Sequence, residues 1–190
     1  MSARSARRRA FLAAGLLLVA ACRASTTAVR DLDDRPLDPL AASDARATVL
    51  VFTDPECPIA NAFAPELARL FAEFAPRGVR FYLVYADGSR SAADVSAHVA
   101  GFAHPMPAVR DPEHELVRRS GATRTPEACV FLPEGELVYR GRIDDRYVDF
   151  GKQRAAPTTR DLRDALEAVL AGDAPVRPWA PAIGCTIPDR

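Results

Sequence analysis

The sequence has no excess of either charge, no internal repeats and no low-complexity tracts. Its 190 residues carry 25 basic and 25 acidic side chains, so the formal net charge at pH 7 is zero. Balanced charge argues against a dedicated binder of nucleic acid or of an acidic surface. The missing repeats exclude a solenoid or a propeller. The length suits one ordinary globular domain with some additional chain.

Several motifs of catalytic and metal-binding sites are also missing. The three histidines, His98, His104 and His114, are scattered without the H-x-x-H or C-x-x-C spacing of a zinc site. We therefore predict no metal site and expect such histidines at the surface. Gly-rich phosphate loops, serine–histidine elbows and nucleic-acid stacking motifs are absent too, so no nucleic-acid partner is expected.

The N-terminus has the pattern of an export signal. Residues 1–10 are rich in arginine and lack acids, and residues 11–21, FLAAGLLLVAA, form an apolar run of 11. Such a run is too short to span a bilayer as a helix, so residues 1–21 are predicted as a signal peptide. V-A-A-C, ending at Cys22, resembles a bacterial lipobox, which implies cleavage before Cys22 and lipidation of its thiol. R-R-A-F-L at residues 8–12 resembles a twin-arginine signal, with a general-secretion signal as the alternative.

The mature chain divides into three parts by composition. Residues 22–45 are polar, contain two prolines and have no steady hydrophobic period, so we predict a tether between lipid and domain. Residues 46–172 carry regular hydrophobic patterns and form the predicted domain. Residues 173–190, here called the tail, contain four prolines and Cys185 and are predicted to be irregular. We expect the protein in the cell envelope, on the periplasmic side, attached to the membrane by its lipid.

The domain alternates predicted strands and helices. Pro65 is expected to kink the first helix unless the helix starts just before it, and Ser91 is expected to cap the second. Strand–helix–strand units imply parallel pairing with right-handed crossovers, and a hairpin adds antiparallel strands. The sequence thus predicts an α/β fold with a mixed sheet flanked by helices. The expected order is strand 47–53, helix 61–75, strand 77–87, helix 91–102, short strand 106–111, short helix 112–122, hairpin 127–141 and helix 158–172, capped by Thr158 or Thr159.

Three motifs in this order resemble the thioredoxin-like superfamily, in particular its redoxin branch of alkyl hydroperoxide reductase and thiol-specific antioxidant-like proteins. They are Asp-Pro-Glu-Cys-Pro at residues 54–58, Gly-Ala-Thr-Arg-Thr-Pro at residues 121–126, and the hairpin at residues 131–141. The resemblance covers about residues 45–172 and implies a thioredoxin-like fold. It also implies that Thr125–Pro126 is a cis-proline element that faces a reactive cysteine.

The same resemblance places Cys57 at the position of the nucleophile. Cys57 lies at a predicted helix N-terminus, where unpaired amides and the helix dipole favour a thiolate. Asp54 and Glu56 act against the thiolate because they are negatively charged. Pro58, Thr125 and Pro126 would shape the groove around the sulfur. The alternative is a buried structural cysteine that remains from an ancestral site.

The chain departs from its relatives at the positions that assist this cysteine. Ala60 stands where a dithiol thioredoxin has its second cysteine. Asp54 stands where a peroxiredoxin has Thr or Ser, and Asn61 where a Sco-type copper protein has another cysteine. Cys57 therefore has no second cysteine at the nearby positions where these relatives have one.

The remaining cysteines differ in their surroundings. Acylation of Cys22 would leave three thiols, and export makes disulfides possible. Cys129 lies in an apolar strand and is predicted to be a core residue. Cys185 follows Gly172 by 13 residues, which span up to about 43–47 Å when extended, so the tail is long enough to bring Cys185 to Cys57. Cys185 would then be a resolving cysteine or a structural staple; otherwise it is an exposed thiol or forms an intermolecular bond.

These observations leave three functional hypotheses. The first is a redox protein that acts on protein thiols and disulfides or on peroxide through Cys57, with Cys185 as resolving partner and no dissociable cofactor. Within it, the missing Thr favours disulfide exchange. The second is a non-catalytic binding module for Cu(I) or a partner protein, with Cys57 and Cys185 as ligands and His104 or His114 as a possible further ligand. The third is a static domain whose Cys57–Cys185 disulfide fastens the tail.

Overall fold

The computed structural model describes residues 27–41, 44–175 and 178–189. The predicted signal peptide and Cys22 lie outside these ranges. Within them, no helix has the length and apolar character needed to cross a membrane.

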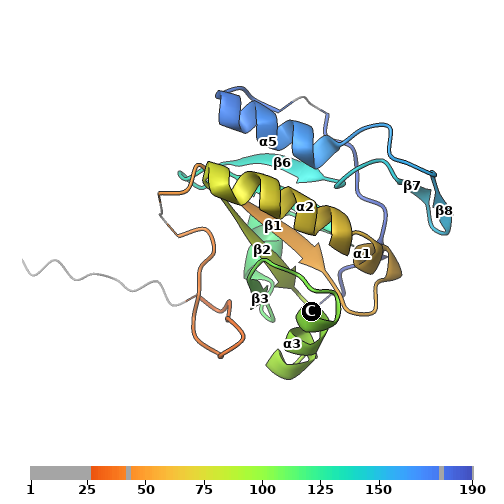
Figure 1. Cartoon of the computed structure of the whole chain (residues 1–190). Helices are drawn as coiled ribbons and strands as arrows, with labels where there is room; N and C mark the ends of the chain where they lie inside the picture. The colour runs from red at the N-terminus through yellow and green to blue at the C-terminus, as the bar shows by residue number, and fades with distance from the viewer. Residues whose placement is uncertain (1–26, 42–43, 176–177, 190) are drawn as a thin grey trace, which may run out of the picture.

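A five-stranded mixed sheet forms the centre of the domain (Figure 1). Its strand order is β3-β2-β1-β5-β6. The first three strands are mutually parallel, and the hairpin adds two antiparallel strands next to β1. This is the arrangement that the alternating strand–helix pattern and the hairpin predict. The strands are β1 (Ala47–Thr53), β2 (Val79–Tyr85), β3 (Ala108–Arg110), β5 (Glu127–Phe131) and β6 (Leu137–Gly141).

Helices pack against both faces of the sheet. One face carries a core in which α1, α2 and α5 pack on alternate residues of the strands, such as Val49 and Val51. In Figure 1, α2 lies in front of the sheet and α5 lies alongside β6. The opposite face is covered by α4 and by segments from both ends of the chain. The helices are α1 (Pro58–Ala62), α2 (Ala64–Phe74), α3 (Ala92–Gly101), α4 (Glu115–Ser120) and α5 (Asp161–Ala171), with a 3₁₀ turn η1 (Ala75–Arg77) after α2.

The helix boundaries follow the local sequence signals with one exception. Pro65 lies in the first turn of α2, so the predicted kinked helix is two helices that meet at Phe63. Ser91 caps α3 in a reciprocal capping box with Asp94. The expected cap of α5 is wrong: the backbone N–H groups of Thr158 and Thr159 donate to the buried carboxylate of Asp145, and the helix begins after Arg160 without a side-chain cap.

The segment from Thr27 to Ala41 lies on the domain, which differs from the polar tether expected over residues 22–45. Val29 is fully buried, and Leu37 and Leu40 pack against the same core. Arg30 forms a two-way backbone pair with Arg110 of β3, with N···O distances of 2.9 and 2.8 Å. The few apolar residues of this segment lack a helical or strand period, which is why the sequence did not indicate their burial.

The tail is ordered at its end and returns to the domain. It runs back from α5 towards the end of the molecule at which α1 lies (Figure 1). Cys185–Thr186 form a short strand, β9, which pairs antiparallel with β4 (Arg124–Thr125). Between β6 and α5 the chain adds a small hairpin of β7 (Tyr147–Asp149) and β8 (Lys152–Gln153) that the sequence did not predict.

Candidate functional site

Cys57 lies where β1 ends and α1 begins. It is the N-cap of α1, Pro58 occupies the first turn, and the Cys57 sulfur accepts the Ala60 N–H at 3.5 Å. The turn before it is held by Asp54, whose carboxylate accepts the Glu56 N–H at 2.8 Å. Cys57 therefore occupies the helix N-terminus that the sequence predicted.

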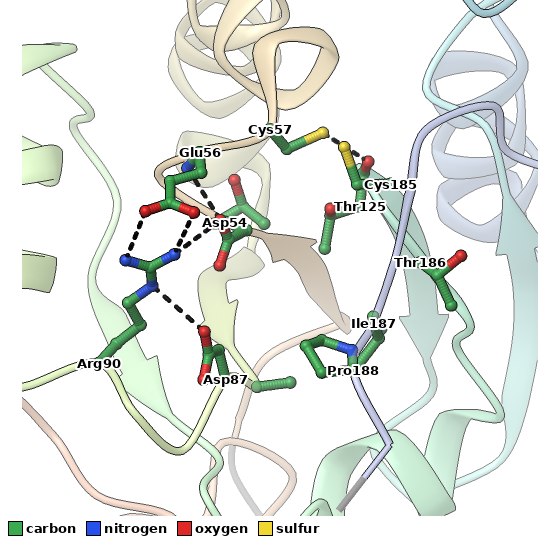
Figure 2. A pocket seen from close by; sticks show the side chains of 12 residues that line it. Asp54, Glu56, Cys57, Asp87, Arg90, Thr125, Cys185, Thr186, Ile187 and Pro188 are labelled. Carbon is green, nitrogen blue, oxygen red and sulfur yellow. Dashed lines mark hydrogen bonds and ion pairs between the residues drawn. The ribbon is translucent and has the colours of Figure 1, made fainter.

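The tail brings Cys185 to Cys57. In the β4–β9 pair, Cys185 lies opposite Thr125, and the Cys57 thiol donates to the Thr125 carbonyl at 2.9 Å. Figure 2 shows the two sulfur atoms directed towards each other beside Thr125. Both cysteines are free thiols in the structure. Two residues that are 128 positions apart in sequence thus meet at one site.

Thr125, Pro126 and the tail fit together closely. The Thr125–Pro126 peptide bond is cis, as the resemblance implied. A Cβ atom on Gly184 would lie 2.0 Å from the Thr125 carbonyl oxygen, so only glycine allows the tail to approach this far. The Ile187 N–H donates to the Thr123 carbonyl at 3.0 Å and continues the pairing. These contacts fix the position of Cys185 beside Cys57.

The two thiols differ in acidity. Burial favours the neutral thiol of Cys57, but hydrogen bonds from Cys185 and from the Ala60 amide outweigh it, so the pKa of Cys57 lies below the usual cysteine value. Burial and the adjacent Cys57 sulfur raise the pKa of Cys185 to about 11, with a smaller effect from Asp54. Cys57 is thus the sulfur that ionises first, and Cys185 remains a thiol that donates to it.

A cavity of about 290 Å³ opens beside the two sulfurs. Cys57 itself is only 1 % exposed, whereas Cys185 is partly exposed. The tail contributes one side of the cavity through Thr186, Ile187 and Pro188. Cys57 borders this cavity but is almost fully buried, so full access to its sulfur requires that the tail moves.

An arginine and three carboxylates form the other side of the cavity (Figure 2). Arg90 pairs with Asp54 at 3.4 Å, with Glu56 at 3.1 Å and with Asp87 at 3.3 Å. Its hydrogen bond and charge lower the pKa of Glu56. The sequence predicted that Asp54 and Glu56 would act against the thiolate, and Arg90 offsets part of their charge.

Arg90 and Asp87 were not among the residues that the sequence indicated. They follow β2, and the Cys57 turn follows the neighbouring parallel strand β1. The carboxyl ends of adjacent parallel strands lie at the same edge of a sheet, where ligand sites commonly form. The position of Asp87 directly after a predicted buried strand was the available signal.

His98, His104 and Cys129 lie within the protein, whereas His114 is partly exposed. His98 and His104 are buried, which corrects the expectation that they lie at the surface. Burial lowers the pKa of His104 to about 4, so its ring is neutral at pH 7. Cys129 is fully buried in the core, as predicted, and burial raises its pKa strongly. Among the described residues, no group of three or more His, Cys, Asp or Glu side chains is arranged to hold a metal ion.

Comparison with solved structures finds two similar proteins without an assigned function. An uncharacterized conserved protein from Geobacillus kaustophilus shares 27 % identity, with a TM-score of 0.73 over 85 % of this chain and 87 % of its own. A hypothetical protein from Sinorhizobium meliloti 1021 shares 25 % identity, with a TM-score of 0.71 over 84 % and 88 %.

A third similar structure is a secreted Mycobacterium tuberculosis disulfide oxidoreductase homologous to E. coli DsbE. It shares 19 % identity, with a TM-score of 0.52 over 77 % of this chain and 96 % of its own. At this identity the likeness concerns the fold. No curated protein sequence matches the chain significantly.

The family comparison agrees with the fold. Residues 22–140, which include the Cys57 turn and the Thr125–Pro126 element, match the AhpC/TSA family. The mixed sheet, the cysteine at the first helix of the domain and the cis-proline beside it are what the resemblance to the redoxin branch implied. The match extends over more than half of the sequence, and the chain therefore belongs to the AhpC/TSA family of thioredoxin-like redox proteins.

Proposed function

We propose that this protein is an exported thiol–disulfide exchange protein, with Cys57 as its nucleophile and Cys185 as its resolving cysteine. The observation that carries the proposal is the register of the β4–β9 pair. It holds Cys185 opposite Thr125, whose carbonyl accepts the Cys57 thiol proton at 2.9 Å. The difference in acidity between the sulfurs supports the assignment of roles, because the attacking group in exchange is a thiolate.

The reaction proceeds in two exchanges. The Cys57 thiolate attacks one sulfur of a substrate disulfide, forms a mixed disulfide and releases the second substrate sulfur, which takes up a proton. Cys185 then loses its proton and attacks the Cys57 sulfur, which releases the first substrate sulfur as a thiol. The substrate gains two electrons and two protons, and the protein keeps a Cys57–Cys185 disulfide that an external thiol reductant must reduce.

Export and lipid anchoring are part of the proposal. The arginine-rich start, the 11-residue apolar run and V-A-A-C before Cys22 support cleavage of residues 1–21 and a lipid on Cys22. The similar disulfide oxidoreductase from Mycobacterium tuberculosis is a secreted protein, which agrees with this location. An oxidising compartment supplies disulfide substrates.

Peroxide reduction is the second candidate, and the small cavity beside a buried Cys57 favours it. The Cys57 thiolate would take one oxygen of a hydroperoxide and become a sulfenic acid, with release of water or an alcohol. Cys185 would then condense with it, release water and form the same disulfide. Asp54, which stands where a peroxiredoxin has Thr or Ser, places a carboxylate at this position and weakens this candidate.

The test is disulfide mapping of the mature protein across a graded redox buffer. We expect a Cys57–Cys185 disulfide that opens between about −120 and −270 mV, as in thiol oxidoreductases. Cys129 is the internal control and should remain a thiol throughout. A disulfide that persists below about −300 mV indicates a structural staple and overturns the proposal.

Rate measurements separate the remaining alternatives. Exchange requires that the reduced protein reduces a peptide disulfide faster than it consumes peroxide, and the opposite order favours the second candidate. Tight retention of Cu(I) by the reduced protein, without turnover of either substrate, favours the binding module.

A further inference from the structure

Asn61 links two carbonyl groups of the turn that carries Cys57. Its side-chain amide donates from Nδ2 to the Pro55 carbonyl at 2.8 Å. Its backbone N–H donates to the Cys57 carbonyl at 3.0 Å. Asn61 lies in α1, four positions after Cys57, and the turn between β1 and α1 precedes it. One residue therefore holds the turn on both sides of Glu56.

A buried relay behind Asn61 fixes the orientation of its amide. His98 Nε2 lies 2.8 Å from Asn61 Oδ1, and His98 Nδ1 lies 2.7 Å from the Tyr85 hydroxyl. Tyr85 is 1 % exposed on β2, and His98 is 7 % exposed on α3. The relay thus connects the Cys57 turn to two elements of the domain core.

The position of each proton in this relay follows from one group, the Pro55 carbonyl. The Pro55 carbonyl can only accept a hydrogen bond, so the Asn61 amide must turn its NH₂ towards it and its oxygen towards His98. The amide oxygen can only accept, so His98 carries its proton on Nε2. His98 Nδ1 is then an acceptor in the neutral ring, and the Tyr85 hydroxyl donates to it.

The surroundings of His98 keep this arrangement. Its titratable neighbours are Tyr85 on β2, His104 after α3 and, through its charge, Asp54. Burial lowers the pKa of His98 despite the opposing effect of Asp54, and His104 is neutral as well. A neutral His98 has one donor and one acceptor nitrogen, which is what the relay requires.

We propose that Asn61 is a positioning residue for Cys57 and that the Tyr85–His98 pair orients it. This inference rests on the proposed role of Cys57 as nucleophile. Asn61 acts through the turn: it fixes the direction in which the Ala60 N–H meets the Cys57 sulfur at 3.5 Å. Because a hydrogen bond weakens as its geometry departs from the favourable range, a shift of the turn removes part of the stabilisation that this N–H gives the thiolate.

The test uses Tyr85→Phe, which deletes the terminal donor and keeps the ring in the core. Without that donor the His98 ring is held at Nε2 only, so the ring and the Asn61 amide that it contacts are less well fixed, which weakens the bond to Pro55. We expect the pKa of Cys57 to rise by about 0.5–1 unit. At a pH below this pKa, the fraction of Cys57 present as thiolate should then fall by about three- to tenfold. Asn61→Ala should give an equal or larger rise. The pKa is measured from the pH dependence of iodoacetamide labelling, resolved by peptide mass spectrometry.

Tyr82→Phe is the matched control. Tyr82 lies on the same strand, packs in the core on the opposite face and bonds through its hydroxyl to Arg80, outside the relay. It should leave the pKa of Cys57 unchanged. Thermal unfolding of each variant shows whether the fold is kept.

Two results overturn the inference. The first is a Cys57 pKa that stays at the wild-type value in folded Tyr85→Phe and Asn61→Ala. The second is an equal rise in Tyr82→Phe, which indicates general loosening of the core. Labelling needs no substrate, so it tests the positioning role of Asn61 even if the wild-type protein proves inactive in exchange. In that case the proposed function fails, and the role of Asn61 is judged separately.

Discussion

At the scale of single residues, the neighbours of the Cys57 sulfur set its reactivity. Cys185 is both the proposed resolving group and a hydrogen-bond donor to Cys57. The two roles are separable because a serine hydroxyl can still donate a hydrogen bond but cannot form a disulfide.

Replacement of Cys185 by alanine should raise the pKa of Cys57, whereas Cys185→Ser should leave it nearly unchanged. A hydrogen bond to a charged group contributes about 1.5–3 kcal/mol, which corresponds to about 1–2 pKa units. Both variants should accumulate the mixed disulfide, since neither can resolve it. The measurement is the pH profile of Cys57 labelling together with mass spectrometry of the trapped adduct. Equal profiles for the two variants would contradict the assigned hydrogen bond.

Arg90→Gln should also raise the pKa of Cys57, but by less. The substitution leaves Asp54 and Glu56 without the cation that pairs with both, and uncompensated carboxylates disfavour a thiolate. Charge interactions near the surface contribute roughly 0.2–1 kcal/mol, so we expect a rise of about 0.5 unit that salt reduces. Cys57 would then react more slowly at pH 7, because the thiolate fraction at a fixed pH falls as the pKa rises. Arg35→Gln, at an exposed pair with Asp33, is the control and should have no effect.

At the scale of elements, the β4–β9 pair controls access to Cys57. Cys57 is 1 % exposed, and the end of the tail lies beside it, where Gly184 permits the close approach to Thr125. The pair is short, which is typical of segments that open locally at low free energy.

Gly184→Ala should release the end of the tail without a change to either cysteine. The added Cβ would lie 2.0 Å from the Thr125 carbonyl, so β9 must move away. If the move removes contacts worth about 1.4 kcal/mol, Cys57 labelling becomes faster by on the order of tenfold, and closure of the Cys57–Cys185 disulfide becomes slower. Gly101→Ala is the control, because a Cβ there meets nothing within 4 Å. Unchanged labelling in Gly184→Ala would show that the tail does not limit access.

At the scale of the whole molecule, the folded unit begins before the predicted domain boundary. Residues 27–41 complete the core on the second face of the sheet, so a protein that starts at residue 46 should be less stable. Contact with this face of the sheet explains why Val29 is fully buried although it lies in a segment without a hydrophobic period.

Val29→Ala should reduce the free energy of unfolding by about 1.5–3 kcal/mol, from lost burial and the cavity left behind. Urea denaturation followed by circular dichroism measures the change. Val148→Ala, at a 46 % exposed position in the β7–β8 hairpin, is the matched control and should stay within about 0.5 kcal/mol. A Val29→Ala protein as stable as the wild type would mean that this segment contributes little to the fold.

The features that could be predicted from the sequence are those that local residue patterns determine. The strands around Val49 and Leu83, the Ser91 cap and the hairpin at residues 127–141 each follow from a few neighbouring residues. The helix N-terminus at Cys57 and the cis bond before Pro126 followed from the family resemblance.

The features that the sequence could not predict depend on distant pairing. The short strand at Cys185 is defined by its partner Thr125 rather than by its own composition. Arg90 is positioned by its ion pair with Asp54 in the Cys57 turn, and Val29 is buried by the sheet face against which it packs. His98 was expected at the surface because its partners Tyr85 and Asn61 are apart from it in sequence.

The two ends of the chain also protect the sheet from strand addition. Arg30 pairs with β3 at one margin, and at the other the Arg142 N–H, next to the end of β6, donates to the Ala180 carbonyl at 3.1 Å. Gly141 lets Ala180 approach, since a Cβ there would lie 2.3 Å from the Ala180 oxygen. Unpaired margins of a sheet are templates for aggregation. Proteolytic trimming of either terminus would therefore expose such a margin and favour self-association, so an intact chain matters for solubility as well as for the meeting of the two sulfurs.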